Sequence, residues 1–467
     1  MKKRGHLILV CVLALCIGYW GYKQFKNTSS LLGKVHVNAN AVIKIGIHDI
    51  KETLVLDALS APKYYYDQIQ FSDSDEEKDS IGGKGIDLQP YNLLLYTLPS
   101  VENTVFGTLD IDDSQEFEQY LAKELQTAEK VLEKKDGYQY ALLPKRKMAL
   151  AWSTDQVVFA FSTAISASDL FPIFSDVLEQ ESTISDSDHP LLAAVDDGDG
   201  HIVFATENGA VDLFFEDGNA TIEGQVFTEK PQQYQKEISV ELEPEAALQL
   251  YYDGNFEQQD NKNTLITALG SFSFFEKNNL QISELMDRTN GFFSISVNGN
   301  TTQTDTIISY TYDDNFEKVA QKTLQTKTVP RIHMNLGAAN ESLLEYLEAQ
   351  ESLGPKQIFE PFPLYQLYAK EDAMNTSFDT FEGIAKTQEQ IRTTFFDCNI
   401  DFKKLQEIVT VPQWKAFLDP LKQLRLSATQ GNDNEIIING HVTGNEPGIN
   451  IISQLAFTKK TDSLPEK

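Results

Sequence analysis

The chain has 467 residues, of which 69 are Asp or Glu and 39 are Lys or Arg, so its formal net charge is −30. A surface with this excess of negative charge repels phosphate backbones, which excludes nucleic acid as a partner. Hydrophobic residues make up 41% of the sequence, enough for packed cores, and the length predicts two or more domains.

The first 26 residues predict a cytoplasmic tip followed by a transmembrane anchor. An uncharged run spans residues 5–22, after Lys2-Lys3-Arg4 and before Lys23. As a helix this run is about 27 Å long, close to the roughly 30 Å core of a bilayer. The positive-inside rule places the N-terminus in the cytoplasm. We therefore expect a single-pass protein of the inner (cell) membrane, which contacts the membrane through this helix and is otherwise periplasmic or extracellular.

The same N-terminus is also compatible with a cleaved signal peptide or with lipidation at Cys16. Cleavage requires small residues at the exit of the apolar run, where Trp20 and Tyr22 stand, and lipidation requires one at Leu15. A retained anchor is therefore the expectation. After the anchor the only cysteine is Cys398, so the ectodomain has no internal disulfide, which favours a bacterial envelope over a secreted animal protein.

The segments after the anchor alternate between strand and helix patterns. Residues 27–40 read as a tether, and alternating apolar residues predict the first strand at 41–47. Asp113 and Glu116 form a capping-box pattern that starts a predicted helix from about 114 to 135. Further strands are predicted at 101–110, 138–143, 148–152 and 157–161, and Asp217-Gly218 predicts a hairpin between 211–215 and 220–226.

The second half repeats the order of these patterns. Residues 426–442 parallel 213–226, and residues 313–320 match 112–122, which would give Phe117 and Phe316 equivalent buried positions. This predicts an internal duplication with domains at 41–235 and 236–457 and a polar tail at 458–467. The expected fold class is α+β: a single N-terminal transmembrane helix, then two related domains of largely antiparallel sheet with flanking amphipathic helices.

The order of a strand, the turn Gly85-Ile86-Asp87 and a strand running into a Phe-bearing helix resembles a class of uncharacterised bacterial envelope-anchored proteins. These proteins have a two-part domain of unknown function, and the resemblance would cover most of residues 41–457. It implies α+β architecture and supplies no activity.

Two acidic clusters are the candidate metal sites, because hard cations bind clustered carboxylates. The candidate residues are Asp112, Asp113, Asp196, Asp197 and Asp199. Each cluster also has a simpler interpretation: Asp113 can cap the predicted helix, and the Asp196 cluster can form a hairpin turn. The seven histidines are scattered, and no catalytic or cofactor-binding residue and no cofactor is predicted.

The function expected from the sequence is a non-catalytic, membrane-anchored, extracytoplasmic binding or assembly module of a bacterial envelope, with a protein partner. The aromatic segments 64–66 and 359–365 are candidate contact surfaces for that partner. The alternative is an enzyme with a carboxylate-lined metal or acid/base site in the cleft between the two domains.

Overall fold

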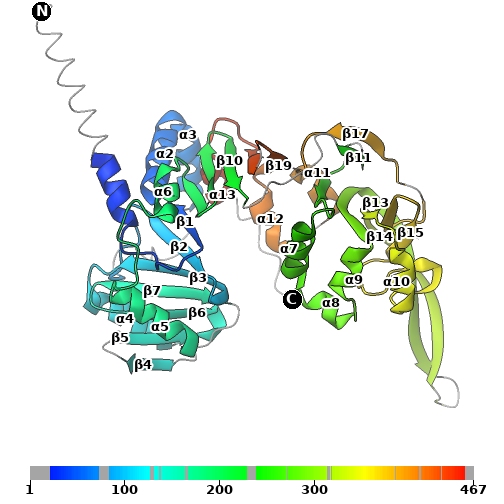
Figure 1. The fold of residues 1–467 in the computed structure, drawn as a ribbon, viewed down its shortest axis with the longest axis horizontal. Helices are drawn as coiled ribbons and strands as arrows, with labels where there is room; N and C mark the ends of the chain where they lie inside the picture. The colour runs from blue at the N-terminus through cyan, green and yellow to red at the C-terminus, as the bar shows by residue number, and fades with distance from the viewer. Residues whose placement is uncertain are drawn as a thin grey trace, which may run out of the picture. The chain divides into compact units, whose positions relative to one another are not determined.

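The computed structural model describes residues 22–457 (Figure 1). The exceptions are residues 73–83, 127–130, 136–137, 163–166, 229–237, 244, 271, 313–315, 317, 384, 410–411 and 433. The chain divides into two compact units. Unit 1 holds the residues up to Phe227 together with Gly448–Asn450, and unit 2 holds Thr228–Pro447 and the residues from Ile451 onward.

Unit 1 contains an antiparallel sheet with the strand order β10-β9-β8-β1-β2-β3-β7-β6-β5-β4. The strands are β1 (Ala41–Ile45), β2 (Leu93–Leu98), β3 (Val101–Asp110), β4 (Val131–Lys135), β5 (Tyr138–Leu143), β6 (Met148–Trp152), β7 (Gln156–Ser162), β8 (Ile202–Thr206), β9 (Gly209–Glu216) and β10 (Asn219–Phe227). Most are rich in β-branched and aromatic residues, which suit a pleated, half-buried surface.

Helices pack on both faces of this sheet. The helices are α2 (Ile47–Ser60), α3 (Pro62–Ser72), α4 (Ser114–Gln126), α5 (Ala167–Leu178) and α6 (Pro190–Asp197). Leu170 and Leu191 of α5 and α6 join Tyr96 and Phe106 in one apolar core. Phe117 of α4 packs with Trp152 in a second core. Each face therefore has its own buried apolar layer.

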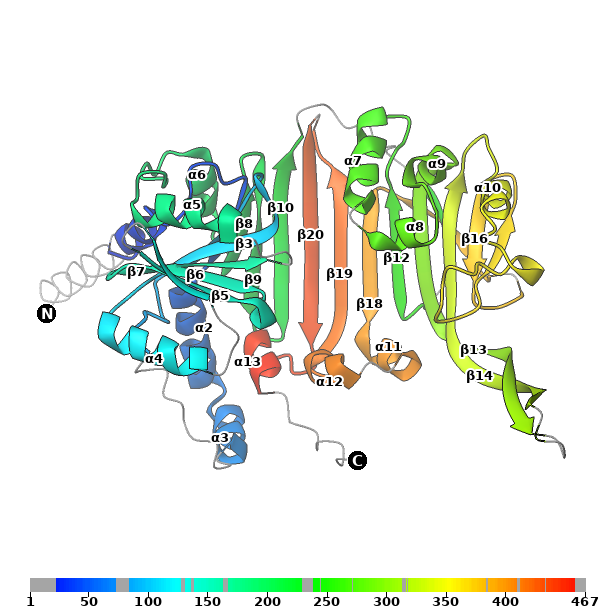
Figure 2. The same ribbon diagram turned by 90° about the horizontal axis from the view of Figure 1, so that it is seen from below.

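Unit 2 contains a second antiparallel sheet with the order β20-β19-β18-β12-β13-β14-β16-β15. Figure 2 shows these strands side by side, with α7, α8 and α9 lying across one face. The strands are β12 (Leu248–Asp253), β13 (Thr289–Tyr312), β14 (Lys318–Ala338), β15 (Tyr368–Glu371), β16 (Asn375–Asp379), β18 (Phe396–Asp401), β19 (Leu421–Gln430) and β20 (Glu435–Gly444). A separate ribbon pairs β11 (Ile238–Leu242) with β17 (Gln388–Arg392).

The two faces of the unit 2 sheet differ in chemistry. Met334, Leu336 and Phe378 point to the face where helices pack, and they share a core with Leu285 and Leu347. The helices of this unit are α7 (Gln259–Gly270), α8 (Ser273–Lys277), α9 (Ile282–Asp287), α10 (Leu343–Ala349), α11 (Phe402–Ile408), α12 (Pro412–Leu418) and α13 (Ile451–Ala456). The opposite face carries polar side chains and holds the candidate site.

The strand order of unit 2 matches strand for strand the order β10-β9-β8-β1-β2-β3-β7-β6 of unit 1. In both sheets the first strand along the chain, β1 or β12, is central. The next two strands extend the sheet on one side, and the last three strands form a meander on the other side. Unit 1 adds β5 and β4 at one edge.

The predicted membrane anchor needs correction. Within the described part of the chain, no helix is both long and apolar enough to cross a membrane. The longest described helix, α2, has 14 residues and carries Asp49, Lys51 and Asp57, charges that oppose burial in hydrocarbon. Of the predicted span 5–22, only Tyr22 is described. The prediction of a fold class with a transmembrane helix is therefore wrong. The description of the chain as a single-pass, signal-anchor membrane protein is wrong for the same reason.

The predicted equivalence of Phe117 and Phe316 is also wrong. Phe117 is 2% exposed on α4, whereas Phe316 is 86% exposed in the turn between β13 and β14, with a φ of +62°. Residues 318–338 form a strand and not the start of a helix. The predicted helix 114–135 also ends at Gln126, and its last residues form β4.

Candidate functional site

The polar face of the unit 2 sheet is built by its strand register. His333 of β14 pairs with Ser296 of β13 and with Asp379 of β16. Two residues along, Asn335 pairs with Ser294 and with Ser377. Directly opposite residues point to the same face, and so do residues two apart on one strand. These side chains therefore form two adjacent polar rows.

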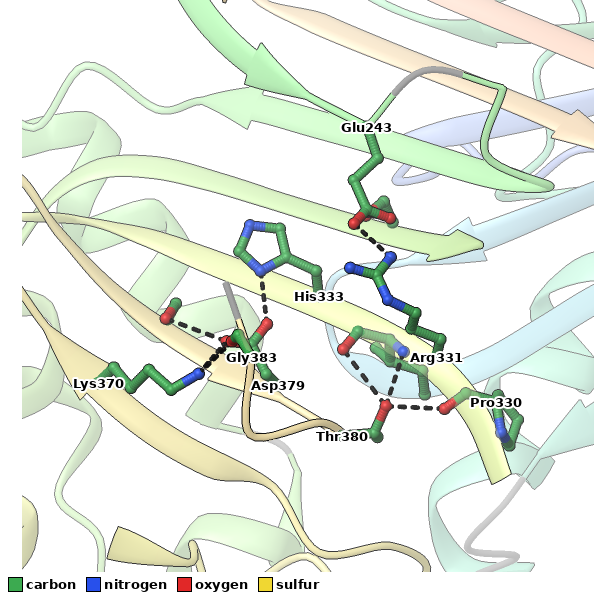
Figure 3. A network of polar contacts seen from close by, with 11 residues as sticks. Glu243, Pro330, Arg331, His333, Lys370, Asp379, Thr380 and Gly383 are labelled. Carbon is green, nitrogen blue, oxygen red and sulfur yellow. Dashed lines mark hydrogen bonds and ion pairs between the residues drawn. The ribbon is translucent and has the colours of Figure 1, made fainter. Parts of the chain in front are cut away.

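His333 and Asp379 form the central contact of the site. Nδ1 of His333 lies 2.6 Å from Oδ1 of Asp379, whose side chain is 3% exposed. A carboxylate accepts a hydrogen bond, so Nδ1 carries a proton, and in the neutral form of the ring Nε2 carries a lone pair. Figure 3 shows that Nε2 is turned away from Asp379. The ring can therefore accept a hydrogen bond from outside the sheet.

The second oxygen of Asp379 receives two longer hydrogen bonds. The Lys370 ammonium and the Ser377 hydroxyl each donate to Oδ2 at 3.4 Å. Lys370 also donates to the Gly383 carbonyl at 2.6 Å, which connects β15 to the loop after β16. Asp379 is thus a buried charge that is fully engaged, as burial of a carboxylate requires.

These residues line a cavity of about 270 Å³. Asn335 also lines it, and this residue is 6% exposed. Within the described residues no hydrogen-bond partner is found for the side-chain amide of Asn335 or for Nε2 of His333. The other lining residues are Glu371, Asp372, Asn375, Gly383, Ala385 and Thr387. A side-chain amide that lines a cavity and has no protein partner marks a place where a ligand can bind.

A neighbouring polar network fixes the strand beneath the site (Figure 3). The Thr380 hydroxyl donates to the Pro330 carbonyl at 2.8 Å and accepts from the Ile332 amide at 2.8 Å. Arg331 forms an ion pair with Glu243, whose side chain is 1% exposed, and its guanidinium lies 4.0 Å from the centre of the Phe381 ring. These contacts hold β14 and the end of β16 in one geometry.

The predicted acidic residues Asp112 and Asp113 lie at the start of α4. Oδ1 of Asp113 accepts from the amides of Gln115 and Glu116 at 2.9 and 3.0 Å, which makes Asp113 a helix cap. The amides of Asp112 and Asp113 donate to the carbonyl of Gly85, which has a φ of +68° and no room for a side chain. This cluster is therefore part of a helix start.

The predicted residues Asp196, Asp197 and Asp199 lie at the end of α6 and just after it. Asp196 accepts hydrogen bonds from Asn27 at 2.6 Å and Thr28 at 3.1 Å. Asp196 and Asp199 line a cavity of about 420 Å³ in unit 1. The structure does not bring this cluster together with Asp112 and Asp113, and the described residues contain no group of three or more His, Cys, Asp or Glu side chains that could hold a metal ion.

The polar groups of the unit 1 cavity are engaged with one another. Lys44, which is 3% exposed, donates to the carbonyls of Val195 and Gly198, both at 2.8 Å, and so caps the C-terminal end of α6. Burial lowers the pKa of Lys44 despite the carboxylates around it, Asp196 among them. Lys23 pairs with Asp49 and Glu52, each at 2.9 Å. The basic side chains of this cavity are therefore engaged by the protein itself.

The sequence analysis missed the unit 2 site, because His333 and Asp379 are 46 residues apart and neither lies in a motif. The available signal was the alternation of polar residues at 333 and 335 and at 375, 377 and 379. In segment 359–365, a candidate contact surface for a partner, Phe359 and Phe362 pack against the core, while Leu364 is 64% exposed.

No protein-family model matches the sequence, and no curated protein matches it at a significant level. Among solved structures, the chain is similar to crystal form I of TP0453, with 6% sequence identity over 73% of this chain and 87% of that chain. The TM-score of 0.20 is too low to carry an argument about fold or function.

Proposed function

We propose that this chain is a binding module and that the cavity beside His333, Asn335 and Asp379 is its ligand site. The observation that carries the proposal is Asn335, a residue only 6% exposed that lines the cavity and whose side-chain amide has no partner among the described residues. A polar ligand would replace the hydrogen bonds of this amide to water with hydrogen bonds of its own, a net gain of about 0.5–1.5 kcal/mol for each bond. The envelope location and the protein partner stay predictions from the sequence.

The cavity favours a small ligand. Its volume of about 270 Å³ lies near the lower end of the range for small-molecule sites, roughly 300–1,000 Å³. Most of its lining residues come from β14, β15 and β16, which are paired strands, and Asp372, Gly383, Ala385 and Thr387 lie in the loops beside them. A site on paired strands is held more rigidly than one built from loops alone, and this favours selective binding.

Thermal melting of the full-length chain tests this proposal. The chain is melted with amino acids, carboxylic acids, polyamines, nucleosides and sugars, and Asn335→Leu, which keeps a similar side-chain shape, is melted in parallel. Ligand at a hundredfold excess over Kd stabilises the folded chain by about 2.7 kcal/mol. At least one compound should raise the Tm of the wild type and not of the variant. Asn439→Leu, on β20 outside the cavity, is the control and should respond like the wild type.

A second candidate function, general-base catalysis, is favoured by the His333–Asp379 pair. A carboxylate that holds Nδ1–H leaves Nε2 ready to take a proton from water or a substrate. The Ser377 hydroxyl, however, donates to Asp379 and not to His333, so the pair does not activate Ser377 as a nucleophile in this arrangement. Hydrolysis of a p-nitrophenyl ester, faster with the wild type than with His333→Gln, would support this candidate.

A further inference from the structure

The charged side chains of the unit 2 cavity are already engaged by the protein. Lys370 binds Gly383 and Asp379, and Asp379 also binds His333. Asp372 accepts from the amides of Met374 and Asn375 at 2.8 and 2.9 Å. A charged ligand would therefore find no unpaired opposite charge among these groups. No new ion pair would then offset the free-energy cost of removing its charge from water.

Glu371, the remaining charged lining residue, is engaged in the same way. It accepts from the Thr376 hydroxyl at 2.8 Å, from the Leu343 amide at 2.9 Å and from the Ser342 hydroxyl. Burial raises its pKa, and these hydrogen bonds outweigh that effect and lower it. Its carboxylate thus belongs to the N-terminal end of α10 and is not left for a ligand.

The groups that remain for a ligand are neutral. Nε2 of His333 accepts a hydrogen bond, and the Asn335 amide both donates and accepts. The Ser377 hydroxyl uses its proton on Asp379 and keeps lone pairs that can accept. A hydroxyl group of a ligand also donates and accepts, so hydroxyl groups match this set, and each would satisfy a group that the protein leaves unpaired.

We infer that the ligand is a neutral, hydroxyl-rich compound of the carbohydrate class. The inference rests on the proposed function and specifies its ligand. A peptide is a poorer match, because peptides are usually recognised by pairing at a sheet edge or by apolar anchors in a groove. This cavity lies on the face of β14, β15 and β16, and apart from Gly383 and Ala385 its lining residues have polar side chains.

Matched sugars test the charge argument. Glucose, galactose and mannose are each compared with their uronic acid, which is anionic, and their 2-amino sugar, which is cationic, by calorimetric titration of the full-length chain. N-acetylglycinamide, neutral but without hydroxyls, is the amide probe. At least one neutral sugar should bind ten times more tightly than its charged relatives and the amide probe. Asn335→Leu should weaken that binding about tenfold, and Asn439→Leu should not.

Two results would overturn the inference. If a uronic acid, an amino sugar or the amide probe binds best and Asn335→Leu weakens that binding, the ligand class is wrong while the binding site stands. If no sugar binds the wild type more tightly than Asn335→Leu, the carbohydrate class is wrong. The proposed function then fails only if the broader panel of compounds also shows no difference between the two proteins.

Discussion

His201 shows how hydrogen bonds fix the protonation state of a single residue. Its Nδ1 accepts from the Phe215 amide at 3.0 Å, so this nitrogen carries no proton, and Nε2 lies 2.8 Å from the Thr53 hydroxyl. Protonation would turn an N–H toward the Phe215 N–H and break the first bond. Burial lowers the pKa of His201 below 6.5, and the charges of Asp49 and Glu216 oppose this shift only in part.

We therefore expect His201 to make unit 1 less stable in acid. The unfolded chain binds a proton near pH 6.5, and the folded chain binds it only at a lower pH. The contribution of neutral His201 is present above pH 6.5 and is lost as the pH falls through its folded pKa. In thermal melts, the stability difference between wild type and His201→Gln should shrink or reverse from pH 8 to pH 5. An unchanged difference across this range contradicts the prediction.

At the scale of elements, Glu371 shows how a strand residue can stabilise a helix in the same unit. It lies at the end of β15 and binds the backbone at the start of α10, where helix amides lack intrahelical partners. A carboxylate there also interacts favourably with the helix dipole. Its contribution to stability is present above pH 4.5 and is lost as the pH falls through the lowered pKa.

Glu371→Gln should reduce the free energy of unfolding by about 1–3 kcal/mol at pH 7, because it weakens hydrogen bonds to a charged group. The variant should also lose the part of the acid dependence that Glu371 supplies. Denaturant unfolding at pH 7 and pH 4 measures both effects. Glu348→Gln, in the last turn of the same helix, is the control. An equal loss at both pH values would show that the charge of Glu371 is unimportant.

The two phenylalanines that the sequence equated give a direct test of packing. Phe117 is 2% exposed and meets the Trp152 ring edge-on, with 5.9 Å between ring centres, whereas Phe316 is 86% exposed. Phe117→Ala should cost about 3–5 kcal/mol through the cavity it leaves, and Phe316→Ala should cost less than about 0.5 kcal/mol. Chemical denaturation measures both values. Similar costs for the two variants would contradict the structure.

Elements with a clear local pattern could be predicted from the sequence. The bounds of β3, β5 and β6 match the predicted strands at 101–110, 138–143 and 148–152. The hairpin at Asp217-Gly218 is also confirmed, because Gly218 adopts the positive φ of +69° that the turn requires. Local chemistry decides these cases, since each depends on residues close together in the chain.

Elements whose local pattern is ambiguous were predicted wrongly. The acidic residues at 313 and 314 look like a helix start, but the segments on either side are rich in Thr and form the β13–β14 hairpin. Thr favours strands because its branched side chain packs well on a pleated surface. The site was missed for a related reason, since its residues come together only through the pairing of β14, β15 and β16.

At the scale of the whole molecule, the chain returns to unit 1 after forming most of unit 2. Gly448–Asn450 belong to unit 1. The Gly218 amide donates to the Ile449 carbonyl at 2.7 Å, and the Asn450 amide donates to Asp57 at 2.9 Å. Asn450 is 0% exposed, and its side chain donates to the Phe215 carbonyl at 3.1 Å. Unit 1 is therefore complete only when the C-terminal part of the chain is present.

We expect this segment to stabilise unit 1 even though 220 residues separate Phe227 from Gly448. Asp57 is 4% exposed, and without the Asn450 amide its buried carboxylate would lose one of its partners.

A chain that ends at Pro447 should lose protection of the Phe215 amide and of its neighbours on β9 in hydrogen exchange, because local opening becomes easier. Asn450→Ala should cost about 1–3 kcal/mol, since it removes the side-chain bond to Phe215. A chain that ends after Phe457 keeps the segment and serves as the control. If the shorter chain protects β9 as well as this control does, the segment contributes nothing to the fold of unit 1, and the N-terminal residues are sufficient by themselves.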